Sequence, residues 1–312
     1  MLNRRRSWLH SGRRALLVLV LAMGLAIAGC GSSSTSAVGG RGTPVVASIN
    51  AWGSILAQLG GTRVQAKSVL TNPNTDPHSY EPSPADARAV ATSRLMVLNG
   101  VGYDSWADKL LAANPDSTRV VINVGALVGV GPGGNPHRWY SPADVAKMVD
   151  AVTAGLKTLD PANAAYFDDQ RQVFNDQALA RYHALIADIR ATYAGVPVGA
   201  SESLFVPLSE ALGLNLVTPA SFLRAISEGT DPSSTDKAAI DNQIATKAIK
   251  VYVYNSQNST PDVAAQVKAA KAKGIPVAVV TETLSPPEAS FEEWQSAQLQ
   301  VLNDALRVGT GK

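Results

Sequence analysis

From residue 44 onward, short apolar runs alternate with helical patterns. Each run is rich in Val, Ile and Leu, and stretches with helical spacing of apolar residues, such as 52–59, lie between them. The strand-like runs of the first half are 45–50, 64–70, 95–98 and 120–124. Short, nearly continuous apolar strands separated by helices are typical of a parallel sheet covered on both faces. The pattern therefore predicts an N-terminal α/β lobe over residues 44–159.

The same alternation returns after Gly195. The strand-like runs of the second half are 196–200, 214–217, 249–254 and 275–280. They predict a second α/β lobe over residues 196–312, so the fold class is α/β with two sandwich lobes. Because ligands of open α/β sheets bind beyond the carboxyl ends of the strands, we expect a cleft between the lobes.

A long helical pattern separates the two lobes. Residues 162–193 contain no Gly or Pro, and Tyr182, Ile189 and Tyr193 recur at helical spacing. At about 1.5 Å per residue such a helix reaches roughly 48 Å. We expect one long rigid helix to connect the lobes over 160–195. The alternative is a pair of helices broken near Asn175 and Asp176.

The first 29 residues have the pattern of an export signal. Five Arg precede the uncharged apolar run 15–28, which is shorter than the roughly 20 residues of a membrane span. Residues 27–30 resemble a bacterial lipobox, in which Cys30 becomes lipidated. Residues 30–43, rich in Ser and Gly, predict a flexible tether. The expected location is the outer face of the cell membrane, anchored through the lipid on Cys30. The general and twin-arginine export routes both stay open.

Charge and cysteine content narrow the classes of partner. The precursor has 27 Lys and Arg against 25 Asp and Glu; removal of 1–29 takes away five Arg, leaving 22 against 25, a net charge of −3. This balance argues against a nucleic-acid partner. Because Cys30 is the only cysteine, the exported chain has no internal disulfide and depends on its core for stability. We expect a monomer.

Two of the four histidines lie in matching loop-to-helix contexts. His78 lies between Pro77 and Pro82, ahead of Ser-Pro-Ala-Asp at 83–86, and His137 lies ahead of the same four residues at 141–144. Each tetrapeptide predicts a helix start with a Ser cap, Pro at the first position and Asp at the third. His10 falls in the export segment and His183 in a helical pattern, where a structural role is expected.

One carboxylate follows each of two C-terminal strands. Glu202 comes after the run 196–200, and Glu282 after 275–280. Two imidazoles and two carboxylates at the cleft would suit a divalent transition metal. Two glutamates exposed at strand ends, with no metal, are the alternative that spacing alone leaves open.

Several motifs resemble a known family. They are 76–84 around His78, Asn99-Gly100-Val101-Gly102-Tyr103, Asn135-Pro136-His137-Arg138-Trp139 and Asp160-Pro161-Ala162-Asn163. In this order they resemble the zinc and manganese solute-binding lipoproteins of bacterial ABC importers, the cluster 9 family. The resemblance covers nearly all of 44–307.

The resemblance implies a fold and a set of ligands. It implies two lobes joined by one long helix, with a metal between them held by His78, His137, Glu202 and Glu282. The family usually has Asp at the last position, so Glu282 is a departure, and Ser141 replaces the family's usual acidic helix cap. The implied function is capture of one Mn²⁺ or Zn²⁺ ion as cargo and its delivery to an ABC importer permease.

Neither the metal nor the function class is fixed by these residues. Two carboxylates beside two imidazoles favour Mn²⁺, whereas the intrinsic affinity order favours Zn²⁺. A secreted metallohydrolase would use similar ligands, but the chain has no HExxH motif and no nucleophile elbow, so we expect no enzyme. A lipid-anchored surface adhesin is the other alternative.

Overall fold

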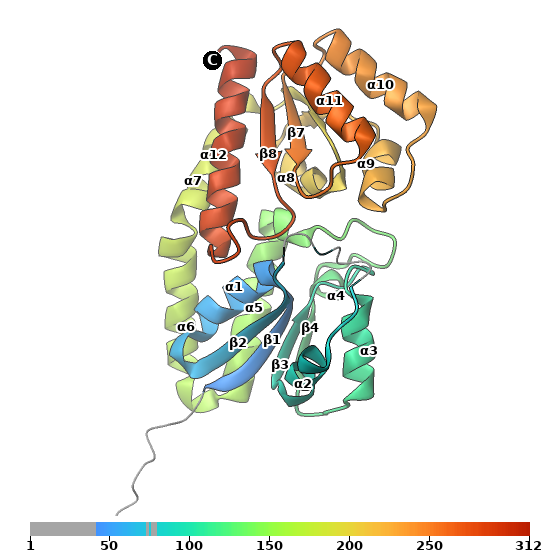
Figure 1. Ribbon diagram of the computed structural model, residues 1–312. Helices are drawn as coiled ribbons and strands as arrows, with labels where there is room; N and C mark the ends of the chain where they lie inside the picture. Colours follow the sequence, from blue (N-terminus) through green and yellow to red (C-terminus); the bar gives the residue numbers. More distant parts are fainter. Residues whose placement is uncertain (1–41, 73–74, 76–79) are drawn as a thin grey trace, which may run out of the picture. The chain divides into compact units, whose positions relative to one another are not determined.

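Two four-stranded parallel sheets form the centres of two lobes (Figure 1). The structure is a computed structural model that describes residues 42–72, 75 and 80–312. The predicted export segment, Cys30 and His78 lie outside the described residues. The tether is also outside them, except for its last two residues.

The N-terminal sheet has the strand order β2-β1-β3-β4. Its strands are β1 (Thr43–Ile49), β2 (Val64–Leu70), β3 (Leu95–Leu98) and β4 (Val120–Asn123). All four predicted strands are present and all pairs are parallel. The fourth ends at Asn123 because the Asn123 side chain accepts a hydrogen bond from the backbone of Ala126 and caps a short helix that begins at Val124.

The C-terminal sheet repeats this arrangement with the order β6-β5-β7-β8. Its strands are β5 (Pro197–Ala200), β6 (Asn215–Leu216), β7 (Val251–Asn255) and β8 (Val277–Val280), again all parallel. In both lobes the first strand in the chain pairs with two others, so the chain changes direction across the sheet beside it. The carboxyl ends of strands at such a point form the usual binding crevice of open α/β sheets.

Helices cover both faces of each sheet, as predicted. In the N-terminal lobe they are α1 (Asn50–Gly60), α2 (Pro84–Thr92), α3 (Ser105–Ala113), α4 (Val124–Val128) and α5 (Pro142–Leu159). In the C-terminal lobe they are α8 (Val206–Leu212), α9 (Ala220–Ser227), α10 (Ser234–Ala245), α11 (Pro261–Ala272) and α12 (Phe291–Thr310). Short 3₁₀ turns are η1 (Gly61–Arg63), η2 (Arg138–Tyr140), η3 (Pro161–Asn163) and η5 (Ser203–Phe205).

The two Ser-Pro-Ala-Asp tetrapeptides start helices as predicted. Ser83 caps α2 in a reciprocal capping box with Asp86, and Ser141 caps α5 by accepting a hydrogen bond from the backbone of Asp144. In each case proline occupies the first turn, where its missing N–H removes no intrahelical bond. These caps set where the helices α2 and α5 begin.

The connector departs from the prediction of a single regular helix. It consists of α6 (Ala164–Val173), a π-helical turn η4 (Phe174–Ala178) and α7 (Ala180–Tyr193). The backbone N–H of Leu179 reaches back five residues to the carbonyl of Phe174, with 2.9 Å between the two atoms. The connector is therefore helical from Ala164 to Tyr193 apart from Leu179, as predicted, and its π-turn lies where the alternative placed a break. Absence of Gly and Pro does not exclude a π-turn, because such a turn needs neither residue.

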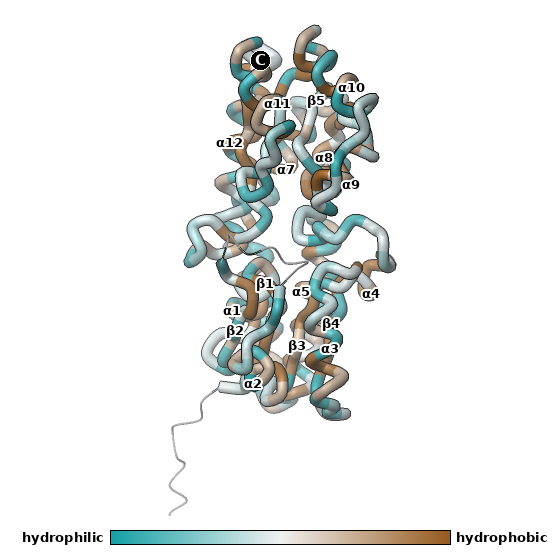
Figure 2. The backbone as a smooth tube through the Cα atoms, turned by 45° about the vertical axis from the view of Figure 1, so that its right-hand side comes forward, coloured by the Kyte–Doolittle hydropathy of each residue, from teal (hydrophilic) through white to brown (hydrophobic). Residues whose placement is uncertain are grey.

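One continuous hydrophobic cluster extends through both lobes and the connector. It includes Trp52 and Met96 in the N-terminal lobe, Tyr182 in α7, and Leu204 and Leu302 in the C-terminal lobe. Figure 2 shows brown, hydrophobic stretches along β1 and β3 inside the N-terminal lobe. Helix α12 packs along α7 and against β8 (Figure 1). A second, smaller cluster lies on the other side of the C-terminal sheet, between it and α10 and α11.

Candidate metal centre

Three of the four predicted ligands come together. His137, Glu202 and Glu282 each offer one ligand atom, and these atoms all lie within 4.8 Å of one another. His137 and Glu202 are nearly inaccessible to solvent, with exposures of 2% and 1%. His78 lies outside the described residues, so its assignment as a ligand stays a prediction. The structure thus forms a site from three residues widely separated in the sequence.

The sheet topology explains why the two carboxylates meet. Glu202 follows the carboxyl end of β5, and Glu282 follows the carboxyl end of β8. Since both strands belong to one parallel sheet, these ends lie on the same edge. His137 comes from the N-terminal lobe, directly before the 3₁₀ turn η2. The candidate centre is therefore shared between the lobes.

Asn135 fixes the orientation of the His137 ring. Its Oδ1 accepts a hydrogen bond from the His137 backbone N–H at 3.0 Å and lies 2.9 Å from Nδ1 of the ring. Its Nδ2 donates to the carbonyl of Ser203 at 2.7 Å. A carbonyl can only accept and a backbone N–H can only donate, so both contacts assign the amide oxygen to the side facing His137. Nδ1 therefore carries a proton, and Nε2 is the ring nitrogen that faces the centre.

Glu202 is a buried carboxylate held by two amides. Nδ2 of Asn255 donates to its Oε1, and Nδ2 of Asn258 donates to its Oε2 at 2.6 Å. Burial, followed by the nearby negative charge of Glu282, raises the pKa of Glu202 to about 7, although His137 and the two amides act in the opposite direction. A cation in the centre would supply the positive charge that this carboxylate needs to stay ionised.

Glu282 bridges the two lobes. Its Oε1 accepts a hydrogen bond from the Tyr103 hydroxyl at 2.9 Å and lies 3.4 Å from Nε2 of His137. The Gln257 side-chain oxygen accepts from the backbone N–H of Glu282 at 2.7 Å and fixes the loop after β8. Burial, together with the charge of Glu282, raises the pKa of Tyr103 well above its usual value. Tyr103 therefore remains a neutral hydrogen-bond donor.

The residues around the ligands were not assigned from the sequence. Asn135 and Tyr103 belong to motifs that carried the family resemblance, but the sequence did not show which residues they contact. Asn255 is the last residue of β7, which lies beside β5 in the sheet, and Asn258 follows three residues later. Polar residues after a second, adjacent strand were the available signal for these two amides.

The donor set suits a divalent transition metal. It combines an imidazole nitrogen with two carboxylates, and each carboxylate oxygen has a second lone pair beyond those used by the amides and Tyr103. Among the residues that the structure describes, this is the one group of three or more His, Cys, Asp or Glu with such geometry. The arrangement can hold a cation between the lobes.

Comparisons with known proteins bear on the family and the fold of the chain. Residues 45–305 match the family described as zinc-uptake complex component A, periplasmic. The manganese-binding lipoprotein MntA of Halalkalibacterium halodurans is 28% identical over 155 residues, which cover 48% of this chain and 51% of MntA. The match therefore spans about half the length of that relative.

A longer match and a solved structure extend the comparison. The manganese ABC transporter substrate-binding lipoprotein PsaA of Streptococcus anginosus is 24% identical over 267 residues, 79% of this chain and 82% of PsaA. A manganese-bound variant of the periplasmic metal-binding protein from Candidatus Liberibacter asiaticus superposes with a TM-score of 0.72 at 20% identity, covering 85% of this chain and 99% of that one. The latter similarity shows the two-lobed fold. Since the family match covers most of the residues, the chain belongs to the periplasmic zinc-uptake component A family, as the histidine motifs and the two-lobed architecture implied.

Proposed function

We propose that the protein is an extracytoplasmic solute-binding protein that captures one divalent transition-metal ion and delivers it to an ABC importer permease. The observation that carries the proposal is the convergence of His137, Glu202 and Glu282 within 4.8 Å across the two lobes. With His78 as the fourth ligand, two imidazoles and two carboxylates would surround the ion. The family membership and the names of the relatives support the same function.

The surroundings of the carboxylates favour binding over catalysis. A metallohydrolase needs an open coordination position and a carboxylate free to move a proton. Here Glu202 is buried between two amide donors, and Glu282 accepts from Tyr103. Both carboxylates are therefore fixed in position, which suits an ion that is carried unchanged. We propose that the protein is not an enzyme.

The donor set favours Mn²⁺, with Zn²⁺ as the main competitor. Carboxylate oxygens are harder ligands than imidazole and suit Mn²⁺, yet nitrogen and oxygen sites generally bind Zn²⁺ more tightly. Glu282 is longer than the usual aspartate by one methylene group. The longer side chain is accommodated, because its carboxylate lies beside His137 in the centre.

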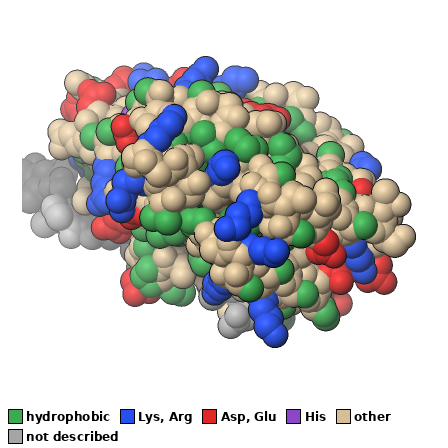
Figure 3. Space-filling view, turned by 90° about the horizontal axis from the view of Figure 1, so that it is seen from above, with side chains coloured by type: hydrophobic (Ala, Val, Ile, Leu, Met, Phe, Trp, Pro, Cys, Tyr) green, Lys and Arg blue, Asp and Glu red, His purple; other side chains and the backbone are tan. Residues whose placement is uncertain are grey.

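The proposed location is the outer face of the cell membrane, with a lipid on Cys30 and the mature protein as a monomer. No helix in the described part of the chain is long and apolar enough to cross a membrane. Figure 3 shows Lys and Arg interspersed with Asp and Glu on one face of the molecule. That mixture does not favour a nucleic acid as partner.

Calorimetric titration with Zn²⁺ and Mn²⁺ tests the proposed function. The parent should bind one ion, and alanine at His78, His137 or Glu282, or Glu202→Gln, should each weaken binding at least tenfold. His183→Ala is the matched control because this exposed histidine lies in α7, outside the centre. Unchanged affinity in both His78→Ala and His137→Ala would remove the basis for the site. Binding of a host ligand by metal-free protein would favour the adhesin alternative, and metal-dependent hydrolysis would favour the enzyme.

Anchoring is tested separately by Cys30→Ala. The variant should lose the lipid and appear in the soluble fraction after cell fractionation, while binding metal like the parent. Persistence in the membrane fraction after a salt wash would contradict the lipoprotein assignment.

A further inference from the structure

Asn135 contacts the candidate metal centre and the opposite lobe with the same amide group. We propose that it is a positioning residue that makes retention of the metal depend on contact between the lobes. The inference rests on the proposed function, which supplies the metal. It concerns a residue that offers no ligand atom itself.

The two halves of the amide have different partners. The oxygen faces the backbone N–H and Nδ1 of His137, and the nitrogen donates to the carbonyl of Ser203 in the C-terminal lobe. Because the amide is planar, the Ser203 contact also determines which edge faces His137. Contact between the lobes therefore holds the ring with Nε2 directed at the centre.

The C-terminal side of this contact is braced. The Ser203 backbone N–H donates to the Ser227 hydroxyl at 3.1 Å, and the two serine hydroxyls lie 2.8 Å apart. Ser203 also follows Glu202 directly in the chain. The Asn135–Ser203 hydrogen bond thus connects the backbone beside one predicted ligand to the side chain that orients another.

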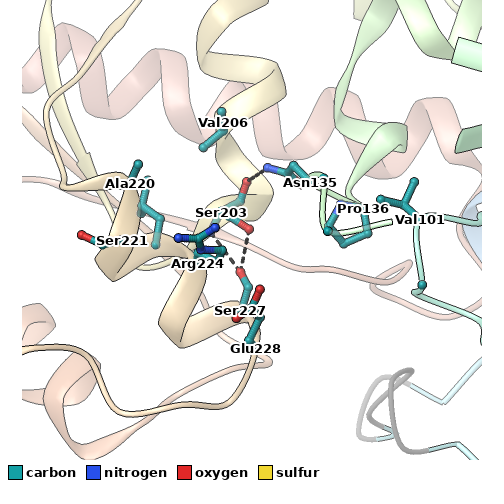
Figure 4. Close-up of a pocket in the computed structure, with 14 residues that line it drawn as sticks. Val101, Asn135, Pro136, Ser203, Val206, Ala220, Ser221, Arg224, Ser227 and Glu228 are labelled. Atoms are coloured by element: carbon teal, nitrogen blue, oxygen red, sulfur yellow. Dashed lines mark hydrogen bonds between the residues drawn. The ribbon is translucent and has the colours of Figure 1, made fainter. Parts of the chain in front are cut away.

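The contact lies in the wall of a cavity, not in the core. Asn135, Pro136, Ser203 and Ser227 are among the residues lining a cavity of about 500 Å³, with Arg224 on its C-terminal side (Figure 4). Figure 4 shows Asn135 and Ser203 facing each other from the two lobes. Since one side of this hydrogen bond borders a cavity large enough for water, it can break without repacking hydrophobic side chains. Such a bond can open when a partner moves the lobes slightly apart beside this cavity, with the aromatic contacts between them kept.

Once the bond opens, the amide can rotate and present either edge to His137. A nitrogen facing Nδ1 would favour the other tautomer, in which Nε2 carries the proton and cannot bind a metal. Asn135 would then favour retention when the lobes are together and release when they part.

The experiment measures the rate of metal release to an excess of chelator, together with a double-mutant cycle. Ser227→Ala removes the brace without touching His137, and release should accelerate about fivefold, the effect of losing one neutral hydrogen bond. Asn135→Ala should accelerate it more. If both act through the same contact, Ser227→Ala should add little on the Asn135→Ala background.

Two further variants distinguish the positioning role of Asn135 from a direct effect of charge on the cation and from a general effect of hydrogen bonds between the lobes. Asn135→Asp keeps an acceptor for His137 but opposes the Ser203 carbonyl with a negative charge. It should accelerate release, although added negative charge near a cation would by itself slow it. Gln58→Ala is the matched control, because Gln58 Nε2 donates to Glu292 Oε2 at 2.9 Å and links α1 to α12 away from the centre. It should leave the release rate unchanged.

Additive effects in the cycle, or release from Asn135→Asp that is no faster than from the parent, would overturn the proposal. Failure of the parent to bind metal would instead overturn the proposed function.

Discussion

Glu202 and Glu282 occupy different electrostatic surroundings within one site. Glu202 is almost fully buried, and the desolvation of its charge outweighs the two amide hydrogen bonds. Glu282 is about 15% exposed and accepts from Tyr103. Two carboxylates so close together repel each other when both are ionised, so the metal-free site favours a proton on Glu202. A metal must displace that proton.

This competition predicts a pH dependence for metal binding. A carboxyl whose pKa is raised to about 7 in the folded, metal-free protein is protonated below that pH, so metal affinity should fall on acidification. The expected loss from Glu202 alone is about tenfold per pH unit below 7. Calorimetry in buffers of different ionisation enthalpy would report one proton released per ion at pH 6 from this group.

The variant Asn258→Ala tests whether Glu202 governs this pH dependence. Its amide lowers the pKa of Glu202 by donating to the ionised carboxylate, so its removal should raise that pKa further. The pH below which affinity declines should shift upward. A profile that stays in place would show that another group governs the competition.

Stability of the metal-free protein should depend on pH in the opposite sense. Because the folded-state pKa of Glu202 lies above its usual 4.5, folding favours the protonated form. The contribution of this group to the free energy of unfolding should therefore decrease as pH rises from about 4.5 to 7. Metal binding would offset that decrease, since the cation stabilises the ionised carboxylate.

Sequence reasoning at this scale identified residue types and not their partners. His137, Glu202 and Glu282 were predictable because loops before caps and the ends of parallel strands are places where polar side chains gather. The tautomer of His137 was not predictable, because it depends on an amide whose other half contacts residue 203. Such contacts are set by the packing of two lobes and leave no local pattern.

At the scale of elements, strands and caps followed local rules closely. Apolar runs became strands because they are short and rich in β-branched residues, which favours a strand over a buried helix, and the two Ser-Pro-Ala-Asp tetrapeptides became helix starts. The connector did not follow, because the π-turn has no sequence signature in its residues. Its Phe174 is buried, while Asp176 and Gln177 are exposed. The π-turn therefore contains one residue more than a regular α-helical turn. This extra residue keeps the buried faces of α6 and α7 directed at the core.

A one-residue deletion tests this interpretation. Removing Gln177 should convert the π-turn into a regular α-helical turn and leave the buried faces of α6 and α7 in register. Removing the exposed Ala184 within α7 should instead rotate the following residues by about 100° and displace Ile189 and Tyr193 from the core. Thermal unfolding followed by circular dichroism should show a much larger loss of Tm for the Ala184 deletion. Equal losses would contradict this account.

At the scale of the whole molecule, ligands from two lobes should make the metal a stabilising cross-link. A ligand that binds the folded state alone stabilises it by about 2.7 kcal/mol at a hundredfold excess over Kd. For a folded part of this size, that corresponds to a rise in Tm of roughly 5 °C. Differential scanning fluorimetry with and without Mn²⁺ or Zn²⁺ would measure the rise.

His137→Ala should lose most of that rise. Comparison with His183→Ala would show whether the effect is specific to the centre. A parent Tm that saturating metal leaves unchanged would mean that the lobes are not cross-linked by an ion.

The hydrophobic cluster that extends through both lobes also limits how a permease could distinguish loaded from empty protein. Tyr140, which follows His137 closely, packs edge-on against Trp294 of α12 and donates to the Thr281 carbonyl at 2.8 Å. Tyr182 in the connector packs against Phe291 in the same manner. Wide separation of the lobes would expose these aromatic faces at a cost of about 25 cal/mol per Å². The relative positions of the lobes should therefore change little when the metal binds. The permease would have to recognise the loaded protein by a local difference in the surface beside the cleft.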